Sequence, residues 1–431
     1  MTNMDLIKDI KSYEVLDSRG NPTVAAKVLL NNGVSEMAFV PSGASTGKYE
    51  ANEKRDLEES RYQGKGVLKA VNSINTTLKS LLINQDPADI KQIDKLMCEE
   101  DGTSDKSHLG ANAILAVSMA CTKVSAKNFN MPLHNFIAQK GKEIGMSINQ
   151  SLPIPMMNIL NGGAHADNPI DFQEFMIQPS GFETFARALQ CGVEIFHTLK
   201  GILSSRGLST SVGDEGGFAP KLNTPEEALD LIIEAIENSG YKPGEEVNLC
   251  LDVAATEFYK KDYYDVVGMN KKFSSSELVK YLQSLRENYP ISSIEDGLDE
   301  DDWSGWGELV LSLGNNTQLV GDDLFVTNPT RIKKGIERSS ANSVLVKVNQ
   351  IGTISETLEA IKISKENNFS TVISHRSGET EDTFIADLAV GLGSGQIKTG
   401  APSRSDRVAK YNRLLIIEKD SGIRFYDKVN L

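Results

Sequence analysis

The sequence predicts an α/β protein with a C-terminal (β/α)8-type barrel and an N-terminal α+β domain. Its length of 431 residues favours more than one domain. β-prone runs precede helical patterns at the start of the chain, whereas short apolar strands alternate with helices later. A polar stretch before the SLPIPMM segment marks the boundary, so we assign residues 1–140 and 141–431 to the two domains.

The N-terminal domain begins with three β-prone runs, at residues 13–17, 23–30 and 35–40. An RGNP segment and an NNG segment separate them as turn signals. Apolar residues then recur every three or four positions from 67 to 81, which predicts a helix. The small and apolar segment 110–127 predicts a second, tightly packed helix.

Six apolar segments alternate with helices in the second domain: NLCLD, ISSIED, QLVGDD, SVLVKVN, STVISH and GQIKTG. Spacings of about 25–30 residues suit one strand plus one helix, as in a barrel. Barrel enzymes place their chemistry at the carboxyl ends of strands. An open doubly wound sheet shows similar alternation, but we find no glycine-rich turn in the right context for one. The polar residues of these segments are Asp252, Glu295, Asp322, Lys347, His375 and Lys398.

Three of these strand ends are acidic, at Asp252, Glu295 and Asp322. Carboxylates that converge repel one another unless a cation offsets their charge. All-oxygen ligands with positions left for water and substrate favour Mg²⁺. The alternative for each acid taken singly is a loop-start residue or a helix cap.

Lys347 is predicted to point into the barrel, because valines occupy the other face of its segment. Near a divalent cation and other cations, we expect its pKa to fall toward neutrality, which suits a general base. The alternative is a lysine on an edge strand that reaches water.

Loops supply the remaining candidates. Arg376 and Ser377 offer donors for phosphate oxygens. The segment 41–48 fails as a phosphate-binding P-loop and favours a lid that brings Ser42 into the site. Glycine-rich segments at 161–174 and 212–220 carry His165, Gln173, Glu174 and Glu215, for which ordinary turns are the alternative.

Composition restricts the partners. The formal net charge of −14 argues against general binding to nucleic acids or anionic membranes. The four cysteines lie far apart, as expected for a reducing cytosol, and no segment predicts a transmembrane helix or a signal peptide. We therefore expect a cytoplasmic protein; a secreted or surface pool is not readable from these patterns.

Taken together, these segments resemble enolase, the glycolytic 2-phosphoglycerate dehydratase, nearly end to end. The matching blocks include DSRGNPTV at 17–24, SGASTG at 42–47, NGGAHADN at 161–168, GDEGGFAP at 213–220, IEDGLDEDDW at 294–303, KVNQIGT at 347–353, SHRSGETED at 374–382 and IKTGAPSRSDR at 397–407.

The resemblance implies a role for each matching residue. Asp252, Glu295 and Asp322 would hold one Mg²⁺, and Ser42 a second. Lys347 would take the C2 proton of 2-phosphoglycerate, and Glu215, helped by Glu174, would protonate the departing C3 hydroxyl to leave phosphoenolpyruvate. The substrate contacts implied are His165, on a mobile loop, Gln173, His375, Arg376, Ser377 and Lys398. A lysine base with one or two Mg²⁺ ions is the general pattern of this superfamily.

The resemblance also implies a homodimer or a higher homo-oligomer. Ala25 and Ile416 stand where many enolases place a glutamate and an arginine that pair across the dimer interface. We therefore expect an apolar contact there. Two other functions remain to be weighed: a different acid dehydratase of the superfamily, which should lack Arg376, Ser377 and the Ser42 lid, and a non-catalytic binding protein, which should have lost Lys347, Glu215 or the metal-binding acids.

Overall fold

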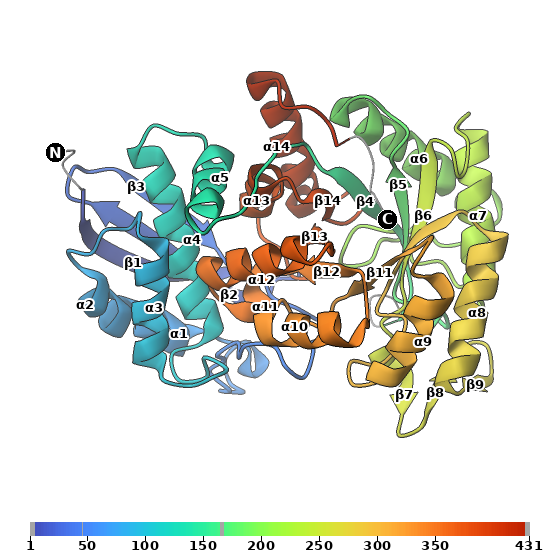
Figure 1. Ribbon diagram of the computed structural model, residues 1–431, viewed down its shortest axis with the longest axis horizontal. Coiled ribbons are helices and arrows are strands. Elements are labelled where there is room, and N and C mark those ends of the chain that lie inside the picture. The colour runs from blue at the N-terminus through green and yellow to red at the C-terminus, as the bar shows by residue number, and fades with distance from the viewer. Residues whose placement is uncertain (1–4, 45, 164–167, 427–431) are drawn as a thin grey trace.

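The computed structural model describes residues 5–44, 46–163 and 168–426, with the N-terminal domain at the left of Figure 1 and the barrel at the right. The N-terminal domain contains an antiparallel sheet of β1 (Ile7–Leu16), β2 (Pro22–Leu30) and β3 (Ser35–Phe39). The first strand begins at Ile7, earlier than predicted, because the buried Ile7 and Ile10 belong to the core.

Helices cover this sheet. α4 (Ala111–Asn128) packs on β2 and β3 and confirms the helix predicted at 110–127. The helix predicted between 67 and 81 is α1 (Leu68–Ser73) and α2 (Lys79–Leu82), joined by a π-helical turn at Ile74–Leu78. α3 (Ile90–Asp101) and α5 (Leu133–Glu143) complete the domain.

Eight strands close into a barrel, which confirms the predicted fold class. Around the ring they follow the order β4 (Ile154–Asn161), β5 (Glu174–Pro179), β6 (Val247–Asp252), β10 (Ile291–Glu295), β11 (Gln318–Gly321), β12 (Ser343–Val346), β13 (Ser370–Ser374) and β14 (Gly395–Lys398). The six predicted segments are β6 and β10–β14. A buried apolar layer fills the interior, from Met156, Met176, Cys250, Val320, Leu345 and Val372.

One strand departs from a regular (β/α)8 pattern. β5 runs antiparallel to both β4 and β6. Its first residue, Glu174, therefore lies beside Asn161 and Asp252, the last residues of its two neighbours. The reversal brings the start of β5 to the same rim as the ends of the other strands.

The remaining elements surround the barrel. Two helices follow β5, namely α6 (Phe185–Ser205) and α7 (Pro225–Asn238). A small sheet of β7 (Tyr259–Lys260), β8 (Tyr263–Val266) and β9 (Lys271–Phe273) follows β6. The later helices are α8 (Ser275–Asn288), α9 (Trp303–Leu313), α10 (Pro329–Arg338), α11 (Val348–Ile351), α12 (Ile354–Glu366), α13 (Phe384–Leu392) and α14 (Ser405–Ser421). None of the helices described is long and apolar enough to cross a membrane.

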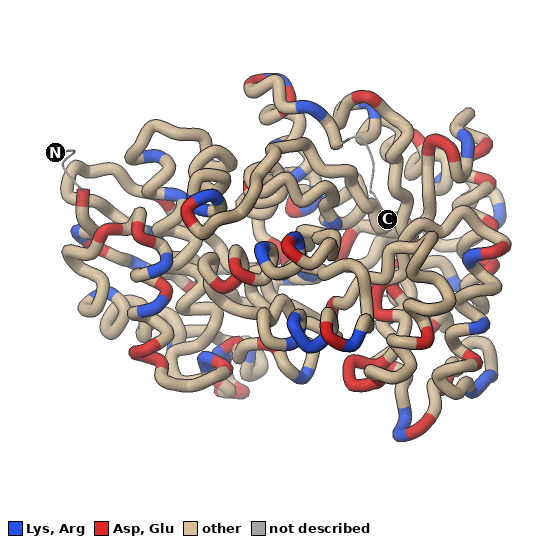
Figure 2. Tube along the Cα trace, in the orientation of Figure 1, with Lys and Arg blue, Asp and Glu red and all other residues tan. Residues whose placement is uncertain are grey.

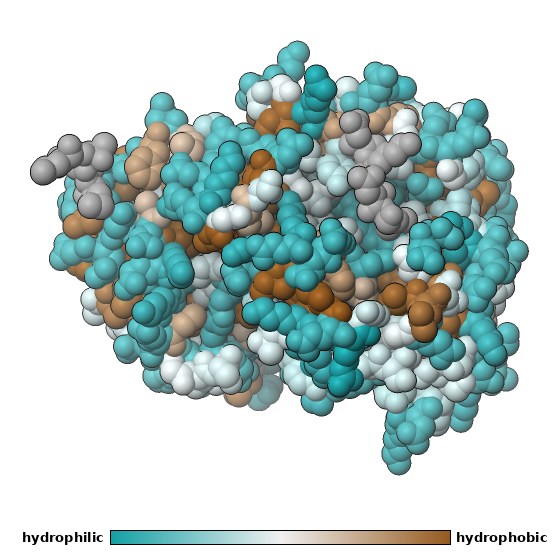
Figure 3. Space-filling model, in the orientation of Figure 1, coloured by the Kyte–Doolittle hydropathy of each residue, from teal (hydrophilic) through white to brown (hydrophobic). Residues whose placement is uncertain are grey.

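Charges of both signs are interspersed along the chain (Figure 2), and the face seen in Figure 3 is mainly hydrophilic, with small apolar patches between its polar side chains. Most buried apolar residues belong to one large core, which includes residues from Ile7 to Phe425 along the sequence and is separate from the layer inside the barrel. The polar side chains that matter for function are those buried at the barrel rim.

Candidate active site

The predicted site residues that the structure describes lie around the rim where the parallel strands end. The three predicted metal-binding acids lie at or just beyond the ends of three consecutive strands, β6, β10 and β11. The basic residues and the serine lie at or just beyond the ends of β12, β13 and β14. β5, with Glu174, stands four places from β12 in the ring of eight, so Lys347 and Glu174 approach from opposite sides. The residues in ring order are Glu174, Asp252, Glu295, Asp322, Lys347, then His375, Arg376 and Ser377, and finally Lys398.

Lys398 joins three of the acids. Its Nζ lies 3.0 Å from Asp252 Oδ2, 2.9 Å from Glu295 Oε1 and 3.2 Å from Glu174 Oε2. The lysine and its partners are almost completely buried. Burial, followed by the neighbouring Asp252, raises the pKa of Glu295 well above its usual range, while Lys398 opposes the shift. The ammonium group therefore offsets a concentration of negative charge.

Lys347 forms an ion pair with Asp322. It lies one residue beyond β12, continues the inward direction of Leu345 and directly precedes α11. Burial lowers the pKa of Lys347, but the Asp322 carboxylate raises it, and the net pKa lies above the usual range. The nearby cations Arg376 and Lys398 lower this pKa, and Asp322 outweighs them. The fall in pKa expected beside a bound divalent cation stays a prediction.

The donors present suit a hard divalent cation. Asp252, Glu295 and Asp322 offer carboxylate oxygens from adjacent strand ends. Gln173 adds a buried amide oxygen that receives no hydrogen bond from any described residue, while its Nε2 donates to Asp252 (3.2 Å). Among the described residues, the groups of closely spaced ligand atoms do not include these three acids together. Lys398 lies against two of them and Lys347 against the third.

Two other groups of ligand atoms lie within 4.8 Å of one another among the described residues, namely Glu174, Glu215 and His375, and Asp296, Asp322 and Asp323. In the second, both oxygens of Asp296 accept hydrogen bonds from the backbone of the other two acids (2.9 and 2.7 Å). Asp296 thereby orients the loop that carries Asp322.

Glu174 and Glu215 form a buried carboxyl pair. Burial, then the charge of Glu215, raises the pKa of Glu174 well above its usual range, against the effect of Lys398. Asn158 donates to Glu215 (2.9 Å), and the backbone of the Glu215 loop bridges to β4 through Phe218. Two carboxyl groups so placed favour sharing a proton.

His375 is held as a neutral ring. Arg407 can only donate, so the contact from its guanidinium Nη1 (2.6 Å) makes His375 Nδ1 the acceptor and leaves the proton on Nε2. That Nε2 lies 3.5 Å from Glu215 Oε2. Burial lowers the pKa of His375 well below its usual range, only partly opposed by Glu215. His375 can therefore donate toward Glu215 without carrying charge.

The predicted phosphate-binding residues face the lid. Arg376 contacts Glu50 with both terminal nitrogens (2.8 and 3.1 Å) and Asn349 Oδ1 with one (3.1 Å). Ser377 Oγ accepts from the backbone nitrogen of Ala44 (2.6 Å). The Glu50 carboxylate is thus bound to the guanidinium of Arg376, which the sequence analysis assigns to phosphate.

Ser42 lies at the beginning of the lid and exchanges two backbone hydrogen bonds with Gly378 (both 2.8 Å). Its hydroxyl donates to Glu53 (2.9 Å) and accepts from Arg55 (3.0 Å). The structure therefore brings Ser42 to the phosphate side of the rim, and its role as a metal ligand stays a prediction.

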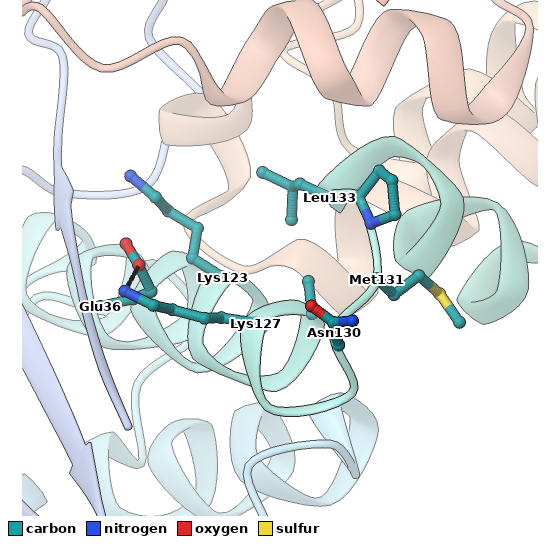
Figure 4. Close-up of a pocket in the computed structure, with 8 residues that line it drawn as sticks. Glu36, Lys123, Lys127, Asn130, Met131 and Leu133 are labelled. Carbon is teal, nitrogen blue, oxygen red and sulfur yellow. Dashed lines mark hydrogen bonds and ion pairs between the residues drawn. The ribbon is translucent and has the colours of Figure 1, made fainter. Parts of the chain in front are cut away.

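The cavity at the centre of the site has a volume of about 20 Å³, roughly that needed by one water molecule. It is lined by Gln173, Glu174, Glu215, Lys347, Lys398 and residues 374–377. A ligand larger than a water molecule would require the ion pairs of Lys347, Lys398 and Arg376 to separate. A larger hollow of about 460 Å³ lies between β3, α4 and the start of α5 (Figure 4). Acids already pair with its two lysines, Lys127 with Glu36 (2.6 Å) and Lys123 with Asp382 (2.9 Å).

His165 lies outside the described residues, so its predicted contact is not placed.

Sequence analysis missed several residues that the structure brings to the site. Gln350 donates to Asp322 (2.7 Å), and it stands only three positions after Lys347. Its place in the KVNQIGT block was an available signal. The other missed residues are Glu50, Asn349, Asp296, Asp323 and Arg407.

The comparison with known families covers most of the chain. The family model described as the enolase N-terminal domain matches residues 7–137. The model described as the enolase C-terminal TIM barrel domain matches residues 149–426. The two matches cover both domains and every candidate site residue.

Proposed function

This chain belongs to the enolase family, and we propose that it interconverts 2-phosphoglycerate with phosphoenolpyruvate and water. The observation that carries the proposal is the placement of Lys347 across the ring from the Glu174–Glu215 pair, with Arg376 and Ser377 beside the lysine. A base and an acid on opposite sides of one small cavity suit removal of a proton from one carbon and a hydroxyl from the next.

Lys347 would remove the C2 proton. Its amine must first lose its own proton and leave Asp322, since a charged ammonium cannot accept. The electron pair of the broken C–H bond moves toward the substrate carboxylate, and Lys398 would stabilise that growing charge. This role suits a buried ammonium that already faces three carboxylates.

The Glu174–Glu215 pair would complete the reaction. Hydroxide is a poor leaving group, so the C3–O bond breaks as Glu215 donates a proton and water departs. Glu174, whose pKa burial and Glu215 raise, would help to keep a proton in the pair, and neutral His375 lies 3.5 Å from Glu215. Arg376 would exchange Glu50 for the substrate phosphate, a bidentate acceptor of the same kind.

Two Mg²⁺ ions per site would supply the remaining charge. Asp252, Glu295 and Asp322 would hold one and Ser42 the other, and bound Mg²⁺ would make the C2 proton more acidic by stabilising negative charge on the substrate. The activity would place the chain in glycolysis, in the cytoplasm, as a homodimer or a higher homo-oligomer.

The direct test is formation of phosphoenolpyruvate from 2-phosphoglycerate, followed by absorbance with Mg²⁺ and with a chelator. We expect turnover only with the metal. Glu215→Gln should reduce dehydration more than it reduces C2 proton exchange, while Glu257→Gln, at an exposed acid outside the site, serves as the matched control. Turnover of unphosphorylated glycerate with none of 2-phosphoglycerate would instead identify a different acid dehydratase.

A further inference from the structure

Tyr49 follows the lid segment 41–48 directly and makes two side-chain contacts with the barrel. The guanidinium carbon of Arg331 lies 3.9 Å from the centre of its ring, a stacked cation–π contact. Its hydroxyl lies 3.0 and 2.9 Å from the two carboxylate oxygens of Asp301. These contacts hold a residue of the N-terminal domain against loops of the barrel.

Arg331 connects two of those loops. From the first turn of α10, its Nε donates to the carbonyl of Leu324 and its Nη2 to the carbonyl of Glu300 (both 2.7 Å). Leu324 follows Asp322, and Glu300 belongs to the loop after Glu295. These two hydrogen bonds hold the Arg331 guanidinium where the Tyr49 ring packs against it. The guanidinium therefore contacts both the loop after Glu295 and the loop after Asp322, two predicted metal-binding acids.

The backbone of the lid end is seated on the same loops. Lys48 N donates to Glu300 Oε2 (3.2 Å). Gly47 packs so closely that an added Cβ would stand 2.8 Å from Asp323 Oδ1. At the other end, Ser42 and Ala44 bind the loop that follows β13. The lid thus spans from the phosphate side of the rim to the side of the acids.

We propose that Tyr49 and Arg331 are positioning residues that fix the C-terminal end of the lid on the loops following β10 and β11. The next residue, Glu50, pairs with Arg376 and would compete with a substrate phosphate for its guanidinium. The position of Tyr49 therefore also determines the position of the Glu50 carboxylate. The kinetic part of this inference rests on the proposed function; the anchoring part does not.

Trypsin tests the anchor without any substrate, because the Lys48–Tyr49 bond is a cleavage site at the anchored end. The measurement is the rate at which a fragment beginning at residue 49 appears by mass spectrometry. Tyr49→Ala should accelerate this cleavage about tenfold, and Tyr49→Phe, which retains the stacked ring, by less. The matched control is Tyr263→Ala, which removes a ring 4.7 Å from Lys272 Nζ in the β7–β9 sheet and should leave the rate unchanged.

Kinetics provide the second readout. Tyr49→Ala should raise the KM for 2-phosphoglycerate about tenfold with a smaller change in kcat and an unchanged melting temperature, and Tyr49→Phe should recover most of the affinity. Cleavage after Lys48 at the wild-type rate, or an unchanged KM, would overturn the proposal. A wild-type protein without turnover would refute the proposed function alone, because the cleavage assay would still report on the anchor.

Discussion

Two buried ammonium groups organise the charge of the site at the level of single residues. Lys398 lies against three carboxylates and Lys347 against a fourth. A buried charge that loses its partner is strongly destabilising. The lysines therefore contribute to the folded state as well as to the proposed chemistry.

Replacing Lys398 tests this balance. Lys398→Met leaves Asp252, Glu295 and Glu174 without their common cation and should lower the free energy of unfolding by about 3–5 kcal/mol. Urea denaturation measures the loss. Millimolar Mg²⁺ should raise the melting temperature of this variant more than that of the wild type, because the carboxylates are then open to the cation.

Lys362→Met is the control for Lys398→Met, because Lys362 pairs with Glu366 on the surface of α12 at 3.9 Å and should contribute little. A Lys398→Met variant as stable as this control would contradict the central place given to Lys398.

The identities of the rim residues were predictable, but several of their partners were not. Residues that end strands of a barrel meet at one rim, so Asp252, Glu295 and Lys398 could be assigned from their segments alone. The contact between Glu50 and Arg376 joins positions 326 residues apart, and no local pattern encodes it. The direction of the Lys347 pKa depends on which carboxylate faces it, which only the folded chain decides.

At the level of elements, the first turn of α12 rests on a buried acid of α3. Asp94 accepts from Ser355 N (2.8 Å), so a helix of the N-terminal domain meets a helix of the barrel through this side chain. Burial raises the pKa of Asp94 to about 6, although its hydrogen bonds with Ser118 and Ser355 oppose the shift.

The raised pKa of Asp94 predicts that the free energy of unfolding depends on pH. A raised pKa means that the folded state binds a proton more tightly than the unfolded state, so the stabilisation is present at low pH. It is lost as the pH rises from about 4 to 6. Relative to Asp94→Asn, the free energy of unfolding of the wild type should fall by about 3 kcal/mol over that interval. Asp89→Asn, at the exposed N-cap of the same helix, should retain the wild-type slope; an identical slope in Asp94→Asn would contradict the assignment.

The antiparallel direction of β5 could not be predicted from the sequence of the strand itself. The six residues of β5 are all buried, but their sequence is compatible with either strand direction, and a regular barrel predicts a parallel one. The reversal of β5 explains why Glu174, a residue that begins a strand, reaches the rim where the other strands end. The alternation from β6 to β14 was predictable because short apolar runs mark each unit. Helix caps add a local signal; Ser274 and Glu277, for example, form a capping box at the start of α8.

For the whole molecule, the two domains build the site together, since Ser42 and Glu50 come from the first and the remaining rim residues from the second.

The expected association of two chains depends on the positions of Ala25 and Ile416. Ala25 is fully buried within β2, between Tyr13 and Phe39 of the neighbouring strands, whereas Ile416 on α14 is 52% exposed. Introducing a glutamate at Ala25 would bury a carboxylate inside one chain, so Ile416 is the better position for a test of the interface.

Ile416→Arg should weaken association, because it places one unpaired charge in a contact that we expect to be apolar. Sedimentation equilibrium measures the change in the dimer dissociation constant, expected at about tenfold or more. Leu311→Arg is the control, at a leucine that is 86% exposed on α9. Equal association of the two variants would exclude Ile416 from the interface.

The central claim is that Lys347 abstracts the C2 proton, and isotope exchange tests it most directly. With 2-phosphoglycerate deuterated at C2 and Mg²⁺ in ordinary water, the wild type should replace the deuterium with protium. Lys347→Ala should show no exchange above background while still binding substrate and metal, and Glu215→Gln should retain exchange while losing dehydration. Exchange at the wild-type rate in Lys347→Ala would contradict the account.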